Sequence, residues 1–309
     1  MAIMSELAAA VDTEKQVHTI AGPYGNLFAI HEPPLESTSV CIIMLSAGFA
    51  SREGSRRLYW RASRSLRNGS GVLRVDLGGV GDSEAETDAR HFDVHRVEEV
   101  YCAIDYAKSQ LGYRRVVLLG LCAGARVALK AAGNRPDVNA IIAWSMPVLT
   151  AGGNFPRSPL EPAVRSSSVT SKADIKRVLH FMLVLRFLHP SWWRLRLASN
   201  TNESLFSIVK NFRNAVIYKI RGEGGATEEN VFVSCVKRYL EKNRNILFVY
   251  GELDATPLAE FESIFTGMAT EGSRQSYHVV GRGQHVFPTL ASQKEVIGVT
   301  SRWIDKHTR

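Results

Sequence analysis

The sequence predicts an α/β fold with a mostly parallel central sheet, helices on both faces and one helical insertion. Strand-like and helix-like segments alternate from residue 17 to residue 144 and again from residue 245 to residue 306. The segments 40–45, 115–120 and 245–250 are almost wholly apolar, which is typical of strands buried on both faces of a parallel sheet. This alternation predicts parallel strands joined by right-handed helical crossovers.

The individual elements follow from the period of the apolar residues and from the turn residues between them. The expected strands are 17–21, 26–31, 40–45, 71–76, 115–120, 138–144, 245–250 and 275–280. The expected helices are 56–67, 97–110, 122–132, 258–268 and 292–306. The turn cluster Gly22-Pro23-Tyr24-Gly25 predicts that the first two strands form a hairpin.

The α/β pattern is interrupted between residues 150 and 245. Residues 150–165 are rich in Gly, Pro and Ser and predict a loop, and three helical segments at 173–188, 203–214 and 230–240 follow. We therefore expect a core domain made of 1–149 and 246–309, with 150–245 inserted as a helical lid.

Composition excludes several classes of protein. The 309 residues are 45% hydrophobic and 22% charged, which is ordinary for a globular protein and excludes a wholly disordered or collagen-like chain. No run of about 20 apolar residues occurs, and the first ten residues lack the basic start of a secretory signal. The four cysteines form no C-x-x-C pair, so we expect a cytoplasmic protein without disulfides or a cysteine zinc site.

The most informative motif is Gly120-x-Cys122-x-Gly124, which lies between an apolar strand and a helix. A sharp strand-to-helix turn needs small residues on either side and exposes the central side chain at the helix N-terminus. Unpaired N–H groups and the helix dipole there favour a thiolate. The motif predicts Cys122 as a nucleophile, with the N–H of Ala123 as a donor to an oxyanion.

Three further segments follow strand ends and complete a catalytic set. Ser46-Ala47-Gly48-Phe49 comes after the strand 40–45, and we expect the Phe49 N–H to be the second oxyanion donor. Asp254 follows the strand 245–250, and His285 follows the last strand about 30 residues later. The order Cys122, Asp254, His285 is that of a nucleophile, an acid and a base.

In these motifs the sequence resembles the α/β-hydrolase fold family, over nearly all of residues 17–306, with the insertion where that family places its lid. Residues 74–83, Arg-Val-Asp-Leu-Gly-Gly-Val-Gly-Asp-Ser, resemble the family's D-x-x-G-x-G-x-S loop. Two departures are plain. Cys122 replaces the usual serine, as in dienelactone hydrolases, polyhydroxyalkanoate synthases and some cyclising thioesterase domains. Ala47 stands where the family usually has histidine.

Other polar and thiol residues receive structural interpretations. Glu252 is a second candidate for the acid, and a helix or turn cap is the alternative role for Asp254. Asp76 and Ser83 are expected to shape their loop. The remaining residues are expected to be packing or surface residues: Cys41, Cys102, Cys235, His91 and His95.

A thiol nucleophile changes the expected chemistry. The acyl-enzyme is a thioester, which water attacks slowly and which an amine, thiol, hydroxyl or enolate can accept. We therefore expect an acyl-transfer enzyme, meaning a thioesterase, acyltransferase or cyclase, acting through acyl-Cys122. The alternatives are a small ester or lactone hydrolase, including exopolysaccharide- or sortase-associated types, and a non-catalytic binding protein of this fold.

The charge is concentrated in the insertion. The chain has a net charge of +8, and 16 basic and 7 acidic residues lie between residues 150 and 245. This predicts an acidic partner such as coenzyme A or an acyl carrier protein. A docking surface is expected at Lys172, Lys176, Arg177, Lys210, Arg213, Lys237 and Arg238.

No other partner or cofactor is predicted. No nucleic-acid recognition motif occurs, and neither histidine spacing nor a G-x-G-x-x-G motif indicates a metal or a bound cofactor. The apolar helix 178–188, followed by Trp192 and Trp193, is too short to span a bilayer. It is expected to line an acyl pocket, with peripheral membrane contact as the alternative.

Overall fold

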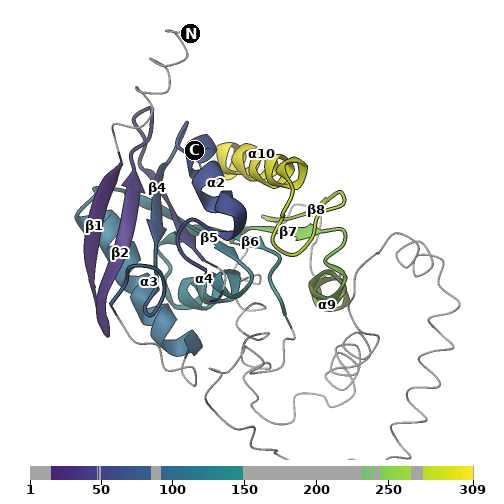
Figure 1. The fold of residues 1–309 in the computed structure, drawn as a ribbon, viewed down its shortest axis with the longest axis horizontal. Helices are drawn as coiled ribbons and strands as arrows, with labels where there is room; N and C mark the ends of the chain where they lie inside the picture. Colours follow the sequence, from purple (N-terminus) through teal and green to yellow (C-terminus); the bar gives the residue numbers. More distant parts are fainter. Residues whose placement is uncertain are drawn as a thin grey trace, which may run out of the picture. The chain divides into compact units, whose positions relative to one another are not determined.

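The computed structural model describes residues 15–46, 48, 50–84, 92–148, 244–265 and 274–308, together with Phe232, Ser234, Val236 and Tyr239. Within these residues one sheet has the strand order β1-β2-β4-β3-β5-β6-β7-β8 (Figure 1). Its strands are β1 Gln16–Gly22, β2 Gly25–Glu32, β3 Val40–Leu45, β4 Gly71–Val75, β5 Arg115–Leu121, β6 Val138–Trp144, β7 Asn245–Gly251 and β8 Gln275–Val280.

The strand directions bring the loops of interest to one edge of the sheet. The hairpin β1–β2 is antiparallel, with Gly22 opposite Gly25, and β2 is antiparallel to β4. From β4 through β3, β5, β6 and β7 to β8, every neighbouring pair is parallel. The carboxyl ends of these parallel strands therefore share one edge, where ligands bind in open α/β sheets.

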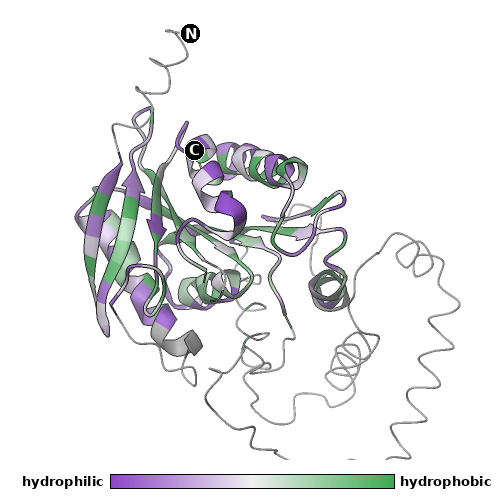
Figure 2. Cartoon of the chain, viewed as in Figure 1, coloured by the Kyte–Doolittle hydropathy of each residue, from purple (hydrophilic) through white to green (hydrophobic). Residues whose placement is uncertain are grey.

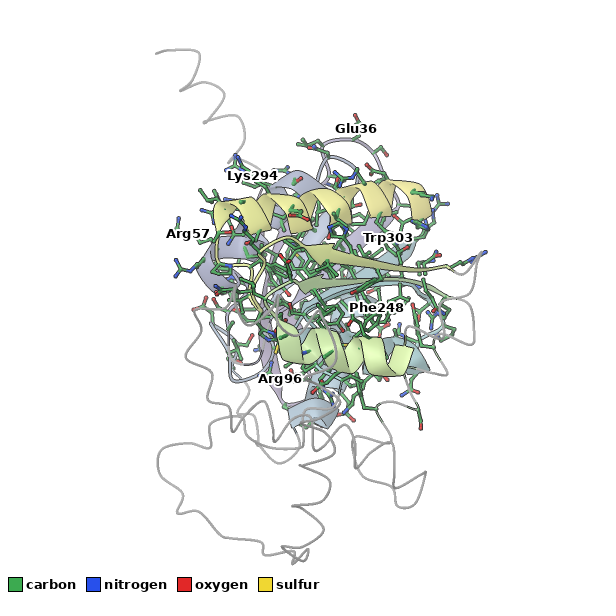
Figure 3. The ribbon with its side chains drawn as sticks, turned by 90° about the vertical axis from the view of Figure 1, so that its right-hand side faces the viewer. Glu36, Arg57, Arg96, Phe248, Lys294 and Trp303 are labelled. Carbon is green, nitrogen blue, oxygen red and sulfur yellow. The ribbon has the colours of Figure 1, made fainter. Side chains whose placement is uncertain are left out.

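The helices cover both faces of the sheet. They are α2 Leu58–Leu66, preceded by the short η1 Ser55–Arg57, then α3 Phe92–Ser109, α4 Ala123–Asn134, α9 Ala255–Phe265 and α10 Leu290–His307. Residues of α2 and α10 pack in one hydrophobic cluster and residues of α3, α4 and α9 in the other. In Figure 3, Trp303 of α10 and Phe248 of β7 lie on opposite sides of the sheet. This confirms the predicted fold class.

The apolar runs explain why the middle strands are central. All six residues of β3 are buried, as are the last six of β5. Figure 2 shows hydrophobic residues along the inner strands, and a mixture of hydrophobic and hydrophilic residues on the hairpin and the helices. A strand without alternating polar residues buries no polar side chain when both of its faces are covered. Such strands favour central positions in a sheet, and β3 and β5 lie there.

Several helix boundaries differ from the expected ones. Helix α2 begins at Leu58 rather than at residue 56, because Arg56 and Arg57 have left-handed φ values of 50° and 59°. Helix α9 begins at Ala255, directly after Asp254 and three residues earlier than expected. Cys41 is buried within β3, and Cys102 of α3 packs against the same core, so both packing assignments are confirmed.

The prediction of a helical lid at 150–245 concerns residues that lie mostly outside the described part of the chain, and so does the docking surface within it. Four residues of the expected helix 230–240 are described and are helical. Three of them, Phe232, Val236 and Tyr239, are buried in the core cluster. Cys235, His91 and the side chain of His95 also lie outside the description.

A histidine pair ties the hairpin to the body of the sheet. The buried His31 hydrogen-bonds through Nε2 to the Tyr113 hydroxyl at 2.9 Å and through Nδ1 to Gln16 at 3.1 Å. His18 lies 5.8 Å from His31 between ring centroids and hydrogen-bonds to Tyr106. Burial, together with His18 and Arg67, lowers the pKa of His31 to about 4.

We predict that this pair makes the stability of the fold depend on pH. Below pH 6.5, the ordinary pKa of histidine, His31 binds a proton in the unfolded chain. In the native state it binds this proton only when the pH falls to about 4. The free energy of unfolding therefore falls as pH decreases through this interval. Urea unfolding of wild type and His31→Gln, at pH 7 and pH 4.5, measures this effect, and the stability deficit of the variant should shrink at pH 4.5. A deficit unchanged between the two pH values contradicts it, and the partly exposed His278→Gln is the control.

Candidate active site

The turn between β5 and α4 holds Cys122 in a strained conformation. Cys122 has φ 55° and ψ −116°, a region that costs a non-glycine residue about 1–3 kcal/mol. Its N–H donates to the Trp144 carbonyl at 2.9 Å, and its carbonyl accepts from the Ala125 N–H at 3.1 Å. The residue follows the last residue of β5 at the carboxyl edge of the sheet, and it is half-buried, where the motif predicted an exposed side chain.

The two glycines of the motif are required by close backbone contacts. A β-carbon on Gly120 would collide with the backbone of Gly124 and Ala125. A β-carbon on Gly124 would collide with the carbonyl oxygens of Leu45 and Ser46 at the end of β3. The first turn of α4 therefore lies directly against the ends of its own strand and of β3, which is the geometry of a nucleophile elbow.

Asp254 and His285 meet across the loops that follow β7 and β8. Asp254 lies three residues beyond β7 and its side chain is 7% exposed. His285 lies in the loop between β8 and α10, and its side chain is 37% exposed. The His285 Nδ1 atom is 2.9 Å from Asp254 Oδ2, so the carboxylate holds one ring nitrogen and leaves Nε2 for another partner.

The interactions of His285 extend to Cys122. Burial acts to lower the pKa of His285, but its hydrogen bond with the Asp254 carboxylate and the nearby Cys122 raise the pKa to about 10. The imidazole is therefore a cation at neutral pH, between a carboxylate and a sulfur atom. An imidazolium beside a thiol stabilises the thiolate, which is the nucleophilic form.

The loop that carries His285 is held by the loop after β7. The Leu253 N–H donates to the Gly283 carbonyl at 2.7 Å, and Gly251 packs so closely on Gly283 that no β-carbon fits. The carboxylate of Glu252, the second candidate acid, accepts the Arg282 N–H at 2.7 Å. Glu252 thus braces the histidine loop, while Asp254 is the carboxylate on the imidazole.

Only one of the two expected oxyanion donors lies in the described part of the chain. Ala123 is the first residue of α4, and N–H groups in the first turn of a helix have no acceptor within the helix. Phe49 and Ala47 fall outside the description, so the second donor remains a prediction. The neighbouring Ser46 hydroxyl donates to the Ser51 carbonyl at 2.9 Å and closes this loop on itself.

A network of charged side chains contacts the loop after β3, and the sequence predicted only part of it. The buried carboxylate of Asp76 accepts the N–H groups of Arg52 and Asp82 and forms an ion pair with the Arg52 guanidinium. The Ser83 hydroxyl donates to the Asp76 carbonyl at 2.6 Å, which agrees with the loop-shaping role expected for both residues.

Arg74 extends the network through the sheet. It is buried in β4 and pairs with the buried Glu32 at 2.8 Å and with Glu53 at 2.5 Å. The D-x-x-G-x-G-x-S pattern indicated the loop, but the pairing of Arg74 with Glu32 depends on the antiparallel β2–β4 register and has no local signal.

Comparison with known proteins agrees with this architecture. Residues 41–156 match a family model described as alpha/beta hydrolase fold. No curated protein sequence matches the chain. The chain has the α/β-hydrolase fold.

Solved structures similar to the chain share its fold at low identity. A dienelactone hydrolase from Anabaena variabilis has a TM-score of 0.58 and 13% identity, covering 96% of this chain and 99% of that one. An esterase from Pyrococcus furiosus has a TM-score of 0.57 and 13% identity, with coverages of 97% and 94%. The α/β hydrolase GrgF from a Penicillium species has a TM-score of 0.60 and 15% identity, with coverages of 95% and 98%.

No helix among the described residues is long and apolar enough to cross a membrane. The expected helix at 178–188, for which peripheral membrane contact was the alternative role, lies outside these residues.

We predict that Gly124→Ala destabilises the fold by about 2–4 kcal/mol, because the new methyl group meets the carbonyls of Leu45 and Ser46. Urea unfolding measures the loss. Gly281→Ala is the matched control, since a β-carbon there has no atom within 4 Å. Equal stability of the two variants would contradict the close packing of the elbow.

We predict that Asp254→Asn lowers the pKa of His285 well below its value of about 10, because the largest raising contribution is lost while burial still acts to lower it. An NMR titration of the ring protons of His285 measures this shift. Glu252→Gln, which alters a neighbouring carboxylate bonded only to a backbone N–H, should leave that titration close to wild type.

Proposed function

We propose that the chain is an acyl-transfer enzyme, a thioesterase, acyltransferase or cyclase, that works through a covalent acyl-Cys122 intermediate. The observation that carries the proposal is the position of His285, which is held by Asp254 at 2.9 Å and lies close enough to Cys122 for the cysteine to raise its pKa. A strained thiol at a helix N-terminus, beside an imidazolium oriented by a buried carboxylate, is the arrangement of an activated nucleophile.

The proposed reaction has two balanced steps. The Cys122 thiolate attacks the carbonyl carbon of a thioester or ester, and the N–H groups of Ala123 and, as expected from sequence, Phe49 stabilise the oxyanion. The carbon–sulfur or carbon–oxygen bond to the leaving group then breaks, and His285 gives it a proton. In the second step His285 takes a proton from the acceptor, which attacks the acyl thioester and releases Cys122.

The chemistry of the intermediate favours transfer over simple hydrolysis. Exchange between two thioesters is close to balanced, so a thiolate takes an acyl group readily from a pantetheine thioester. Water attacks the resulting acyl-cysteine more slowly than an amine or thiol does. The acceptor can therefore be a second substrate or a group within the acyl chain.

An acidic carrier is the proposed source of the acyl group. Coenzyme A and acyl carrier proteins are both acidic, and the segment between residues 150 and 245 carries the basic excess of the chain. A reducing compartment keeps a catalytic thiol from forming disulfides, so we propose a cytoplasmic location.

The second candidate function is hydrolysis of a small ester or lactone. It is favoured by the similarity in fold to a dienelactone hydrolase and to an esterase. This reading uses the same Cys122, His285 and Asp254, with water as the acceptor and no dependence on a carrier.

We predict a mass increase on Cys122 that reports the acyl group directly. Intact-protein mass spectrometry follows wild type, Cys122→Ala and Cys102→Ala after incubation with acyl-pantetheine thioesters and simple esters. Wild type and Cys102→Ala should carry the acyl adduct, and Cys122→Ala should not. Cys102 is the matched control because it is a half-buried free thiol in α3.

The outcomes separate the candidates. An adduct that persists in water and disappears on addition of an amine or thiol supports transfer. Rapid product release from simple esters without an adduct supports the hydrolase. If neither adduct nor turnover appears for any ester or thioester, the enzymatic proposal fails, and a binding protein of this fold becomes the better description.

A further inference from the structure

A buried tyrosine lies beneath the elbow and has no part in the chemistry described above. Tyr59 is in the first turn of α2, and its side chain is fully buried. Its hydroxyl donates a hydrogen bond of 2.7 Å to the carbonyl of Leu45, the last residue of β3. The phenol oxygen therefore lies where β3 ends and the loop beginning at Ser46 departs.

The same side chain also lies near the end of β5. Burial raises the pKa of Tyr59, the neighbouring backbone of Leu121 acts in the opposite direction, and the nearby Cys122 raises the pKa further. Tyr59 is thus a neutral phenol that donates to the end of β3 beside the end of β5.

The contact of Tyr59 with Leu45 forms a bridge to the elbow at the point where the β3–β5 ladder stops. The parallel ladder of β3 and β5 ends at the pair Leu45 and Gly120. Beyond it β3 continues into its loop, and β5 continues into the elbow. The Leu45 carbonyl that accepts from Tyr59 is also the group that excludes a β-carbon on Gly124. The hydroxyl therefore holds the carbonyl against which the elbow packs.

The ring of Tyr59 connects this bridge to the histidine loop. It packs edge-to-face on Trp144 at 5.9 Å between centroids, and Trp144 packs in the same way on Phe287 at 6.3 Å. The carbonyl of Trp144 accepts the N–H of Cys122, and Phe287 is two residues from His285. All three rings are buried on the face of the sheet that α2 and α10 cover (Figure 1).

We propose that Tyr59 is a positioning residue for acyl transfer, whose hydroxyl holds the end of β3 and the Cys122 elbow at the separation that oxyanion stabilisation requires. The inference rests on the proposed function, because it assigns Tyr59 a role in the step that generates an oxyanion. Tyr59 itself touches no reacting atom.

The hydroxyl matters because oxyanion stabilisation is sensitive to small displacements. The donors must lie within hydrogen-bond distance of the oxygen as its charge develops, and a misplacement of about 1 Å costs up to about 100-fold in rate. Tyr59→Phe keeps the ring and its packing but removes the hydroxyl that holds the end of β3. The Leu45 carbonyl would lose a buried donor and shift relative to the elbow that packs on it.

Two reactions of the Cys122 thiol distinguish a positioning role of Tyr59 from a general structural one. Acylation of Cys122 by a pantetheine thioester or activated ester forms a tetrahedral oxyanion. Alkylation by iodoacetamide displaces iodide at a saturated carbon and forms none. For Tyr59→Phe we expect the maximal acylation rate to fall about 10- to 100-fold with little change in the half-saturating concentration. Alkylation should remain within about threefold of wild type.

Tyr239→Phe is the matched control. Its hydroxyl is also buried and donates to a backbone carbonyl, that of Asn245 at the amino end of β7, far from the elbow along the strand direction. Both reactions of this variant should match wild type. Circular dichroism and thermal unfolding establish that each variant is folded. If Tyr59→Phe does not fold, Tyr59→His, which keeps a buried ring and a hydrogen-bonding atom, replaces it.

Hydrogen exchange provides a measurement that needs no substrate. In Tyr59→Phe, amide exchange should accelerate in peptides covering residues 45–52 and 120–124 and remain unchanged in peptides covering β7 and β8. If wild type is not acylated by any compound, the proposed function fails, and this exchange pattern alone decides the role of Tyr59. Unchanged exchange, a uniform increase along the chain, or acylation and alkylation that fall together would overturn the inference.

Discussion

The close approach of the first turn of α4 to the end of β3 is the constraint on which the site depends. Gly124 lies against the carbonyls of Leu45 and Ser46, and Gly120 lies against Gly124 and Ala125. The turn between these contacts holds Cys122 at a positive φ of 55°. Because two backbones are already in contact here, no small side-chain shift can accommodate a methyl group.

The parallel sheet converts this local constraint into a site. Loops after β3, β5, β7 and β8 emerge at the same edge, so groups far apart in sequence converge without long connections. Each loop is then held in place by a different set of contacts. The elbow bonds to the end of β6, the histidine loop is braced by Glu252 and Gly251, and the loop after β3 is tied to Asp76 through Arg52. Strain at Cys122 persists because these contacts over-determine it.

Much of the fold was predictable because its signals are local. The runs in β3, β5 and β7 are apolar enough to require burial on both faces, and every predicted strand appears within one residue at either end. Cys122, Asp254 and His285 could be proposed as a set because each lies in the loop or turn after a parallel strand. The starts of the helices were less predictable. Arg56 and Arg57 adopt positive φ values, so α2 begins only at Leu58, and nothing in the local sequence indicates this conformation.

By itself the sequence determined the alternation of strands and helices, the residues that follow each parallel strand and the glycines that a tight elbow requires. These features depend only on neighbouring residues and on the spacing of apolar residues along the chain. Only the tertiary structure decided that Asp254 rather than Glu252 holds the imidazole, that Arg74 pairs with Glu32, and that the Tyr59 hydroxyl donates to the Leu45 carbonyl at the end of β3. These choices depend on strand order, register and the depth of each side chain, and such quantities exist only after distant segments have packed together.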